Sequence, residues 1–267
     1  MEICCDVDSE LSALAHGYGM RTCRVTQVDR FDWARGLRKA RDFIGANRAV
    51  DAWGALPCTT WCSWQFVNEA KLGPAFCSRL AWRRRQSIRM VGRAELCFAD
   101  ALSAGGGAHF EWPRRRRGWQ RRRVRAMVAS LKLLLADFDG CAVGVMSGPG
   151  LPALKPWRVA TSRPRVAAAL STLRCPGDHD HGHLSGAWAT KSGHYTPHFC
   201  QIVLEAVAED LADSAGPWRT SRVLRLANPK PRRHGRGKGH LERRARRYSL
   251  ATLLGMRRRA PLGSDPG

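Results

Sequence analysis

The sequence contains no long hydrophobic run. No stretch approaches about eighteen uncharged apolar residues, the length at which a membrane-spanning helix becomes a candidate. It also lacks a basic-then-apolar leader at its start, which reads Met1-Glu2-Ile3-Cys4-Cys5. Its ten cysteines do not have the tight, regular spacing of a disulfide scaffold. We therefore expect a soluble, intracellular protein in a reducing compartment, with no membrane partner and with a nuclear or nucleoid location as one option.

Acidic residues and lysine are scarce. Lys+Arg total 45 against Asp+Glu 22, for a formal net charge of +23, and seven of the basic residues are lysine. Arginine offers the forked geometry that suits phosphate and guanine. The charge predicts a polyanionic partner, nucleic acid and in the first place DNA. A G+C-rich coding sequence is the alternative source of this bias, and the oligomeric state stays open.

The chain alternates between strand-like and helix-like segments. Strand-like runs lie at 2–5, 21–26, 50–58, 108–113, 141–146 and 155–161, and helical patterns lie after Asp8-Ser9 and at 33–44, 76–102 and 124–138. This alternation predicts an α/β fold with a mostly parallel sheet and an antiparallel terminal hairpin formed by 141–146 and 155–161. We expect no internal repeat.

Three parts are expected along the chain. Residues 1–162 form the α/β domain, and residues 163–216 complete it with a Cys/His-rich turn and a helix from about Pro197. Residues 217–267 carry 15 Lys+Arg and two acidic residues among Gly, Pro and Ser, which predicts a basic, disordered tail.

Two apolar runs each end near one reactive side chain. The first leads to Cys58, which polar residues follow, and the second is Ala108 to Pro113 and contains Glu111. The carboxyl ends of parallel strands lie at the edge where open α/β sheets bind ligands. The aromatic neighbours of Glu111 would raise its pKa and favour proton donation. The pair predicts a nucleophile and an acid; the alternatives are a buried thiol and a carboxylate paired with the arginines at 114–117.

These runs resemble the motifs of a known enzyme family. Ala55-Leu56-Pro57-Cys58-Thr59 resembles the Pro-Cys nucleophile motif of cytosine-5 DNA methyltransferases, and Phe110-Glu111-Trp112-Pro113 resembles their Glu-Asn-Val motif. The resemblance implies a Rossmann-like fold that binds S-adenosylmethionine (SAM) and a target base flipped out of the stack. It implies that Cys58 attacks C6 of cytosine, that Glu111 protonates N3, and that C5 receives the methyl group. Arg158 resembles an arginine that contacts the base and phosphate.

The resemblance also assigns a cofactor loop. The loop falls at Cys5-Asp6-Val7-Asp8-Ser9, and the acid that binds the ribose hydroxyls falls at Asp29 or Asp32. Residues 4–12 contain no glycine, whereas the family's loop is glycine-rich. About 25 residues separate the second strand from the Cys58 strand, too few for the usual third strand, so we expect an abbreviated sheet. Trp112 stands where the family has Asn, and the large recognition domain is missing after Arg158.

Two further clusters are candidate sites. The first is basic and aromatic and would grip phosphates and stack on bases, unless it is a solvated helix face: Arg114, Arg115, Arg116, Arg117, Trp119 and Arg121. The second would bind zinc, unless it is a polar turn lining a cleft: Cys175, His179, His181 and His183, with His194, His198 or Cys200 as further ligands.

Three functions follow from these patterns. The leading one is a SAM-dependent, cytosine-5-methyltransferase-like protein, active or degenerate; the Trp-rich chain also resembles methyltransferase-like segments of mobile-element polyproteins. The second is a non-catalytic nucleic-acid-binding protein with the same fold, whose affinity depends on the tail. The third is a metal-dependent nuclease that uses Asp178, His179 and His181.

Overall fold

The computed structural model describes residues 1–214, so the tail expected at 217–267 lies outside the described residues. The six strands of the main sheet follow the order β2-β1-β3-β4-β8-β5. Their bounds are β1 Glu2–Ile3, β2 Arg24–Val25, β3 Asp51–Gly54, β4 Gly107–Pro113, β5 Leu134–Asp139 and β8 Pro156–Thr161. Strands β1 to β4 pair in parallel, and β8 is antiparallel to both β4 and β5. The expected α/β fold with a mostly parallel sheet is confirmed.

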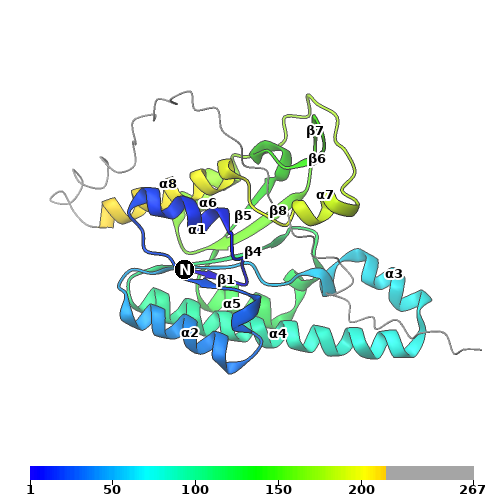
Figure 1. The fold of residues 1–267 in the computed structure, drawn as a ribbon, viewed down its shortest axis with the longest axis horizontal. Coiled ribbons are helices and arrows are strands. Elements are labelled where there is room, and N and C mark those ends of the chain that lie inside the picture. The colour runs from blue at the N-terminus through cyan, green and yellow to red at the C-terminus, as the bar shows by residue number, and fades with distance from the viewer. Residues whose placement is uncertain (215–267) are drawn as a thin grey trace, which may run out of the picture. The chain divides into compact units, whose positions relative to one another are not determined.

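Helices cover both faces of this sheet. Figure 1 shows α1 (Glu10–Ala15), α6 (Pro164–Ser171) and α8 (Pro197–Ser214) on one face, and α2 (Ala34–Ala46), α4 (Gly73–Ser103) and α5 (Arg122–Ser130) on the other. The short helices are α3 (Ser63–Lys71) and α7 (Gly186–Lys191), and a small hairpin joins β6 (Met146–Gly148) to β7 (Leu151–Pro152). No helix within residues 1–214 is both long and apolar enough to cross a bilayer.

Strand β4 lies inside the sheet and is buried on both faces, as expected for a strand between two helical layers. Successive side chains point to opposite faces, so Phe110 and Trp112 pack with α4 and α5 while Glu111 faces the layer of α1, α6 and α8. The strand begins close to β3, since a Cβ atom on Gly106 would lie 2.0 Å from the carbonyl oxygen of Val50. The glycines before β4 therefore allow the beginnings of β3 and β4 to lie close together.

The helix predicted over 124–138 is wrong in its second half. Helix α5 ends at Ser130, Lys132 adopts a left-handed conformation with φ +52°, and β5 begins at Leu134. Leu134 and Leu135 continue the helical spacing of the preceding apolar residues by coincidence, and they are 46% and 49% exposed in the structure. Lysine rarely adopts positive φ, so the sequence gives no sign of this turn.

The predicted strand at 141–146 is also wrong. Residues Gly140–Val143 form a 3-10 helix instead, and the partner of β8 on the hairpin side is β5. Strand β8 therefore lies between β4 and β5, and β5 and β2 are the two edge strands of the sheet. In this register Glu111 lies opposite Val159, and Trp112 lies opposite Arg158.

A buried ionic network joins the amino ends of β3 and β4 to the chain after β8. Arg163 donates two hydrogen bonds of 2.9 Å to the carboxylate of Asp51, and His109 Nε2 lies 2.9 Å from Asp51 Oδ1. Burial alone would raise the pKa of Asp51, but His109 and Arg163 hold it at about 2. His109 Nδ1 also lies 2.9 Å from Thr161 Oγ1. The network fixes the strands beneath the candidate site.

Candidate functional site

Cys58 lies in the loop after β3, at the start of a 3-10 helix over Thr59–Trp61. The strand itself ends at Gly54, four residues before the thiol. The loop is held by Trp112, whose Nε1 donates a 2.7 Å hydrogen bond to the carbonyl oxygen of Leu56. Trp112 therefore anchors the loop that carries Cys58.

Glu111 lies on the opposite face of β4 from Trp112 and is 8% exposed. The hydroxyl of Tyr195, which precedes α8, donates a 3.1 Å hydrogen bond to Oε2 of Glu111. Its other oxygen, Oε1, is buried and has no hydrogen-bond partner among residues 1–214. Burial raises the pKa of Glu111 to about 7, against the opposing effects of Lys155, Tyr195 and Arg116. Near neutral pH this carboxyl is partly protonated and can donate a proton.

Cys58 and Glu111 share their surroundings with two basic side chains, Arg116 and Lys155. Burial raises the pKa of the Cys58 thiol, Arg116 lowers it by its charge and a hydrogen bond, and the charge of Glu111 raises it. Lys155, whose pKa burial lowers, donates a hydrogen bond to the carbonyl oxygen of Ser192. We call Cys58, Glu111, Arg116, Lys155 and Tyr195 the Cys58–Glu111 site.

The structure keeps Arg158 apart from this site. Its guanidinium donates hydrogen bonds of 2.6 and 2.8 Å to Asp137 on β5 and lies 5.7 Å from the ring centre of Trp119. Because Arg158 lies opposite Trp112 in the β4–β8 register, its side chain is on the other face of the sheet from Glu111. Lys155, three residues earlier in the chain, provides a positive charge within the site instead.

Polar side chains in the region assigned to the cofactor are paired within the protein. The hydroxyls of Ser9 and Ser12 both donate to the buried carboxylate of Glu2. Asp29 accepts hydrogen bonds from Thr26 and Lys39, and Asp32 pairs with Arg30. Each of the two carboxylates assigned to the ribose hydroxyls therefore already has a cationic partner within the protein.

The other residues of the loop at 5–9 do not allow its backbone to come close to a ligand. Cys5 is partly buried, and Asp6 and Asp8 are exposed. Residues 4–12 hold no glycine that would bring the backbone against a ligand. Cys4 has a positive φ of 63°, the conformation that glycine takes without strain.

The basic cluster forms a surface with α3 and α4. Arg117 lies over the ring of Phe66 at 3.8 Å, and Arg121 lies over the ring of Trp61 at 4.7 Å. Arg84 of α4 lies near both rings and pairs with Glu69 at 2.6 Å. We call Trp61, Phe66, Arg84, Arg117 and Arg121 the arginine–aromatic surface. Trp61 is 2% exposed, so its ring supports the guanidinium groups from the core, and the exposed part of this surface is cationic.

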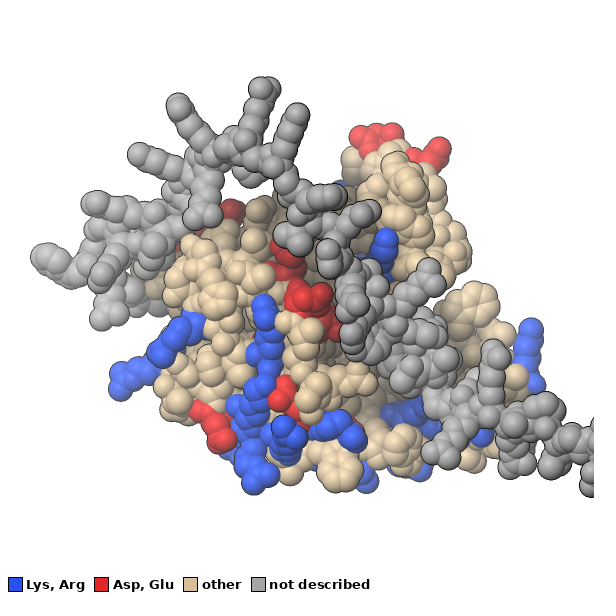
Figure 2. Space-filling model, viewed as in Figure 1, with Lys and Arg blue, Asp and Glu red and all other residues tan. Residues whose placement is uncertain are grey.

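The other members of the cluster differ in exposure. Arg114 lies 4.0 Å from Asp139, and Arg115 is exposed. Trp119 is 8% exposed and packs edge-on against Phe110 and Trp112, so it belongs to the core and cannot stack on a base. Figure 2 shows basic side chains mostly over the lower half of the face it presents, where Figure 1 has α2 and α4.

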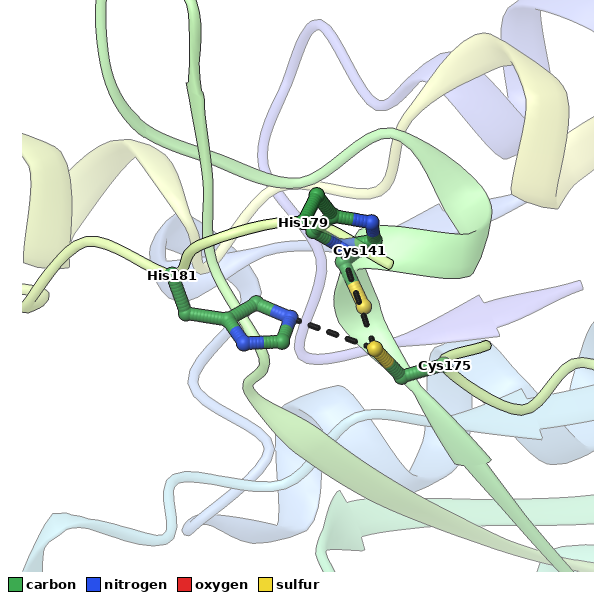
Figure 3. Close-up of side chains that lie close together, drawn as sticks. All are labelled: Cys141, Cys175, His179 and His181. Atoms are coloured by element: carbon green, nitrogen blue, oxygen red, sulfur yellow. Dashed lines mark hydrogen bonds between the residues drawn. The ribbon is translucent and has the colours of Figure 1, made fainter. Parts of the chain in front are cut away.

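The Cys/His turn brings together a cluster that could hold a metal ion. Its members are Cys141, Cys175, His179 and His181, and their ligand atoms all lie within 4.8 Å of one another (Figure 3). His183, His194, His198 and Cys200 are not members of this cluster. Cys141 was missed because its segment was assigned to a strand.

Lys155 and Tyr195 were also missed as site residues. Neither stands in a motif, and each reaches Glu111 only through the packing of β8 and the chain before α8. Comparison with known proteins gives no match: no protein family, no curated protein and no solved structure is recognisably similar to this chain.

Proposed function

We propose that this protein binds nucleic acid and forms a reversible covalent bond between Cys58 and a flipped cytosine, as the first step of the cytosine-5 methyltransferase reaction does. The observation that carries the proposal is the buried Glu111, with a pKa of about 7 and an unpartnered Oε1, in the same surroundings as Cys58. A carboxyl in this state suits protonation of a ring nitrogen near neutral pH.

The strand order supports the same type of fold. The chain leaves β1 for β2 on one side and returns to β3 on the other, so the topology reverses between β1 and β3. Rossmann-like sheets bind ligands at the carboxyl ends of strands beside such a point. The Cys58 loop follows β3, and Glu111 lies near the carboxyl end of the next strand.

The proposed step is an addition that balances without an oxidant or reductant. The Cys58 thiol loses its proton to water, and the sulfur forms a bond to C6 of the cytosine. The electron pair of the C5=C6 double bond forms a new C4=C5 double bond, and the electron pair of the N3=C4 double bond moves to N3. Glu111 gives N3 its proton, and Lys155 and Arg116 balance the resulting carboxylate charge. Reversal of the step releases the unchanged base.

The arginine–aromatic surface would hold the strand around this base. Arg117 and Arg121 are the cations available for phosphate, and Trp64 and Trp82 on the neighbouring helices are 67% and 55% exposed. Exposed indoles near guanidinium groups stack on unpaired bases of any sequence. The surface therefore suits a single strand or a flipped nucleotide.

The proposal includes no methyl transfer, because residues 4–12 lack the glycines of the family's cofactor loop and the hydroxyl of Ser9 is bonded to Glu2. Calorimetric titration of the full chain with SAM is expected to give no binding heat. A saturable heat that substitution of Asp29 by Ala removes would contradict this and restore the complete methyltransferase reaction.

The test of the proposed function is adduct formation on DNA that carries pyrimidin-2-one, whose ring accepts a thiolate at C6 more readily than cytosine. The full chain is expected to give a denaturation-resistant protein–DNA band on duplex or single-stranded DNA. Cys58→Ser should abolish the band, and Cys62→Ser, which removes another partly buried thiol from the same region, should keep it. Equal bands from both variants would overturn the assignment of the nucleophile.

The second candidate is non-covalent binding of nucleic acid. It is favoured by the raised pKa of Cys58, since a protonated thiol is a weak nucleophile. Salt-dependent binding of the same DNA without any band would support this function, and Cys58→Ser would then leave the affinity unchanged.

A further inference from the structure

The Cys/His cluster joins two parts of the chain that are distant in sequence. Cys141 belongs to the 3-10 helix after β5, whereas Cys175, His179 and His181 follow α6. Sγ of Cys175 lies 3.3 Å from Nε2 of His181 and 3.8 Å from Nε2 of His179. Figure 3 shows the two thiols and the His181 ring converging between these segments.

The donor set matches one metal in particular. Two thiolates and two imidazoles in a tetrahedron are the ligands of structural zinc, with Zn–S bonds of about 2.3 Å and Zn–N bonds of about 2.0 Å. Such bonds separate neighbouring ligand atoms by roughly 3.5 Å, close to the two separations measured from Cys175. Magnesium and calcium prefer oxygen ligands, of which this set has none.

Neighbouring groups hold the ligands in binding orientation. Asp178 Oδ1 lies 2.8 Å from Nδ1 of His179, which leaves Nε2 of that ring toward the cluster. The backbone amide of Gly177, which has φ +79°, donates a 3.4 Å hydrogen bond to Sγ of Cys175. Carboxylate and amide partners of this kind accompany metal-bound imidazole and thiolate.

The segment that carries three of the ligands has little else to hold it. None of residues 174–191 is fully buried, and of the apolar side chains there Leu184 packs against the core, so apolar packing offsets little of the conformational entropy lost when this segment is ordered. Directly after it, the carbonyl oxygen of Ser192 accepts a hydrogen bond from Lys155, and Tyr195 donates one to Glu111. A cross-link at the start of the segment would fix the chain that leads to both contacts.

We propose that Cys141, Cys175, His179 and His181 bind one structural zinc ion, which ties the segment from Cys175 to Tyr195 to the end of β5. Four protein ligands close the coordination sphere and leave no position for water, so the ion has a structural role and does not serve a nuclease reaction. This inference does not depend on the proposed addition to cytosine.

The first test is elemental analysis of the purified full chain. We expect one zinc per chain, a loss of most of it in His181→Asn and Cys141→Ser, and full retention in His183→Asn. His183 is the matched control because it lies two residues from His181 and outside the cluster. Equal loss of zinc from His181→Asn and His183→Asn would overturn the ligand set.

A second measurement protects the test against variants that fail to fold. Cobalt added to the metal-free wild-type chain should give the visible absorption of a tetrahedral site, with thiolate charge-transfer bands, and should saturate at one equivalent. Metal removal should also increase protease cleavage within residues 174–191. A chain that holds no zinc and shows no such cobalt spectrum would refute the proposal, whatever the outcome of the DNA experiment.

Discussion

The hydroxyl of Tyr195 donates a hydrogen bond to Oε2 of Glu111 at 3.1 Å while it accepts one from Nε1 of Trp53 at 2.9 Å. This bond stabilises the charged form of the carboxyl and so lowers the pKa of Glu111 relative to what burial alone would give. Tyr195 therefore acts as a positioning residue that also sets the proton affinity of the candidate acid.

Tyr195→Phe is expected to raise the pKa of Glu111 above about 7, because the carboxylate loses its donor while burial persists. Titration of the Glu111 carboxyl carbon by NMR measures the midpoint. Tyr18→Phe is the control, since its hydroxyl lies 3.5 Å from the exposed Glu205. An unchanged or lower midpoint in Tyr195→Phe would show that the hydroxyl does not act on the carboxyl.

The stability of the wild-type fold should fall between pH 4.5 and 7 relative to that of Glu111→Gln. The unfolded carboxyl loses its proton near 4.5 and the folded one near 7, so within this window the unfolded chain binds fewer protons. The difference amounts to about 3 kcal/mol and levels off above pH 7. Urea unfolding of both proteins across this range measures it, and parallel curves would contradict the raised pKa.

Arg163→Leu should destabilise the fold by about 3 kcal/mol, because it removes the bidentate partner of the Asp51 carboxylate, which is 17% exposed and keeps His109 as its neighbour. The stabilisation from ionised Asp51 is present above pH 3.8 and is lost as the pH falls through about 2. Arg165→Leu, two residues along in α6, removes the ion pairs of a 47% exposed arginine with Glu209, Asp210 and Asp213 and should change stability less. Chemical denaturation at neutral pH compares the two; similar losses would argue against a special role of the buried pair.

Arg117→Ala with Arg121→Ala should weaken binding to single-stranded DNA and reduce the slope of log K against log salt by about 1.4, or about 0.7 for each lost phosphate contact. Arg35→Ala with Arg38→Ala removes the same charge from exposed positions on α2 and should change the slope less. Fluorescence anisotropy over a range of salt concentrations measures both pairs. Identical losses would mean that total charge, and not the arginine–aromatic surface, determines affinity.

The alternation of strands and helices could be predicted from the sequence because buried parallel strands are short apolar runs between helical patterns. The expected nearness of Cys58 and Glu111 follows from parallel strand order, although their chemical roles stay predictions. The helix predicted through residue 138 failed at Lys132, where a residue without turn preference takes φ +52°. Local patterns cannot reveal such a turn, since tertiary packing imposes it.

The rest of the site depends on long-range packing. Lys155 and Tyr195 reach Glu111 from segments 44 and 84 residues later in the chain, and neither lies in a recognisable motif. Cys141 joins the metal cluster only because β5 ends beside the loop after α6. Contacts of this kind are fixed by the arrangement of the helical layers around the sheet and leave no periodic signal in the sequence.

Two adjacent residues of β4 have different roles. Glu111 points its carboxyl toward the layer of α1, α6 and α8, and Trp112, on the opposite face of the sheet, anchors the Cys58 loop. A shift of this strand by one residue would exchange the two side chains between faces. It would put a carboxyl among the aromatic rings near Trp119 and an indole where Tyr195 needs an acceptor. An insertion or deletion within 107–113 should therefore impair the site far more than a single substitution. It would misplace both the Glu111 carboxyl and the Trp112 indole that holds the Cys58 loop.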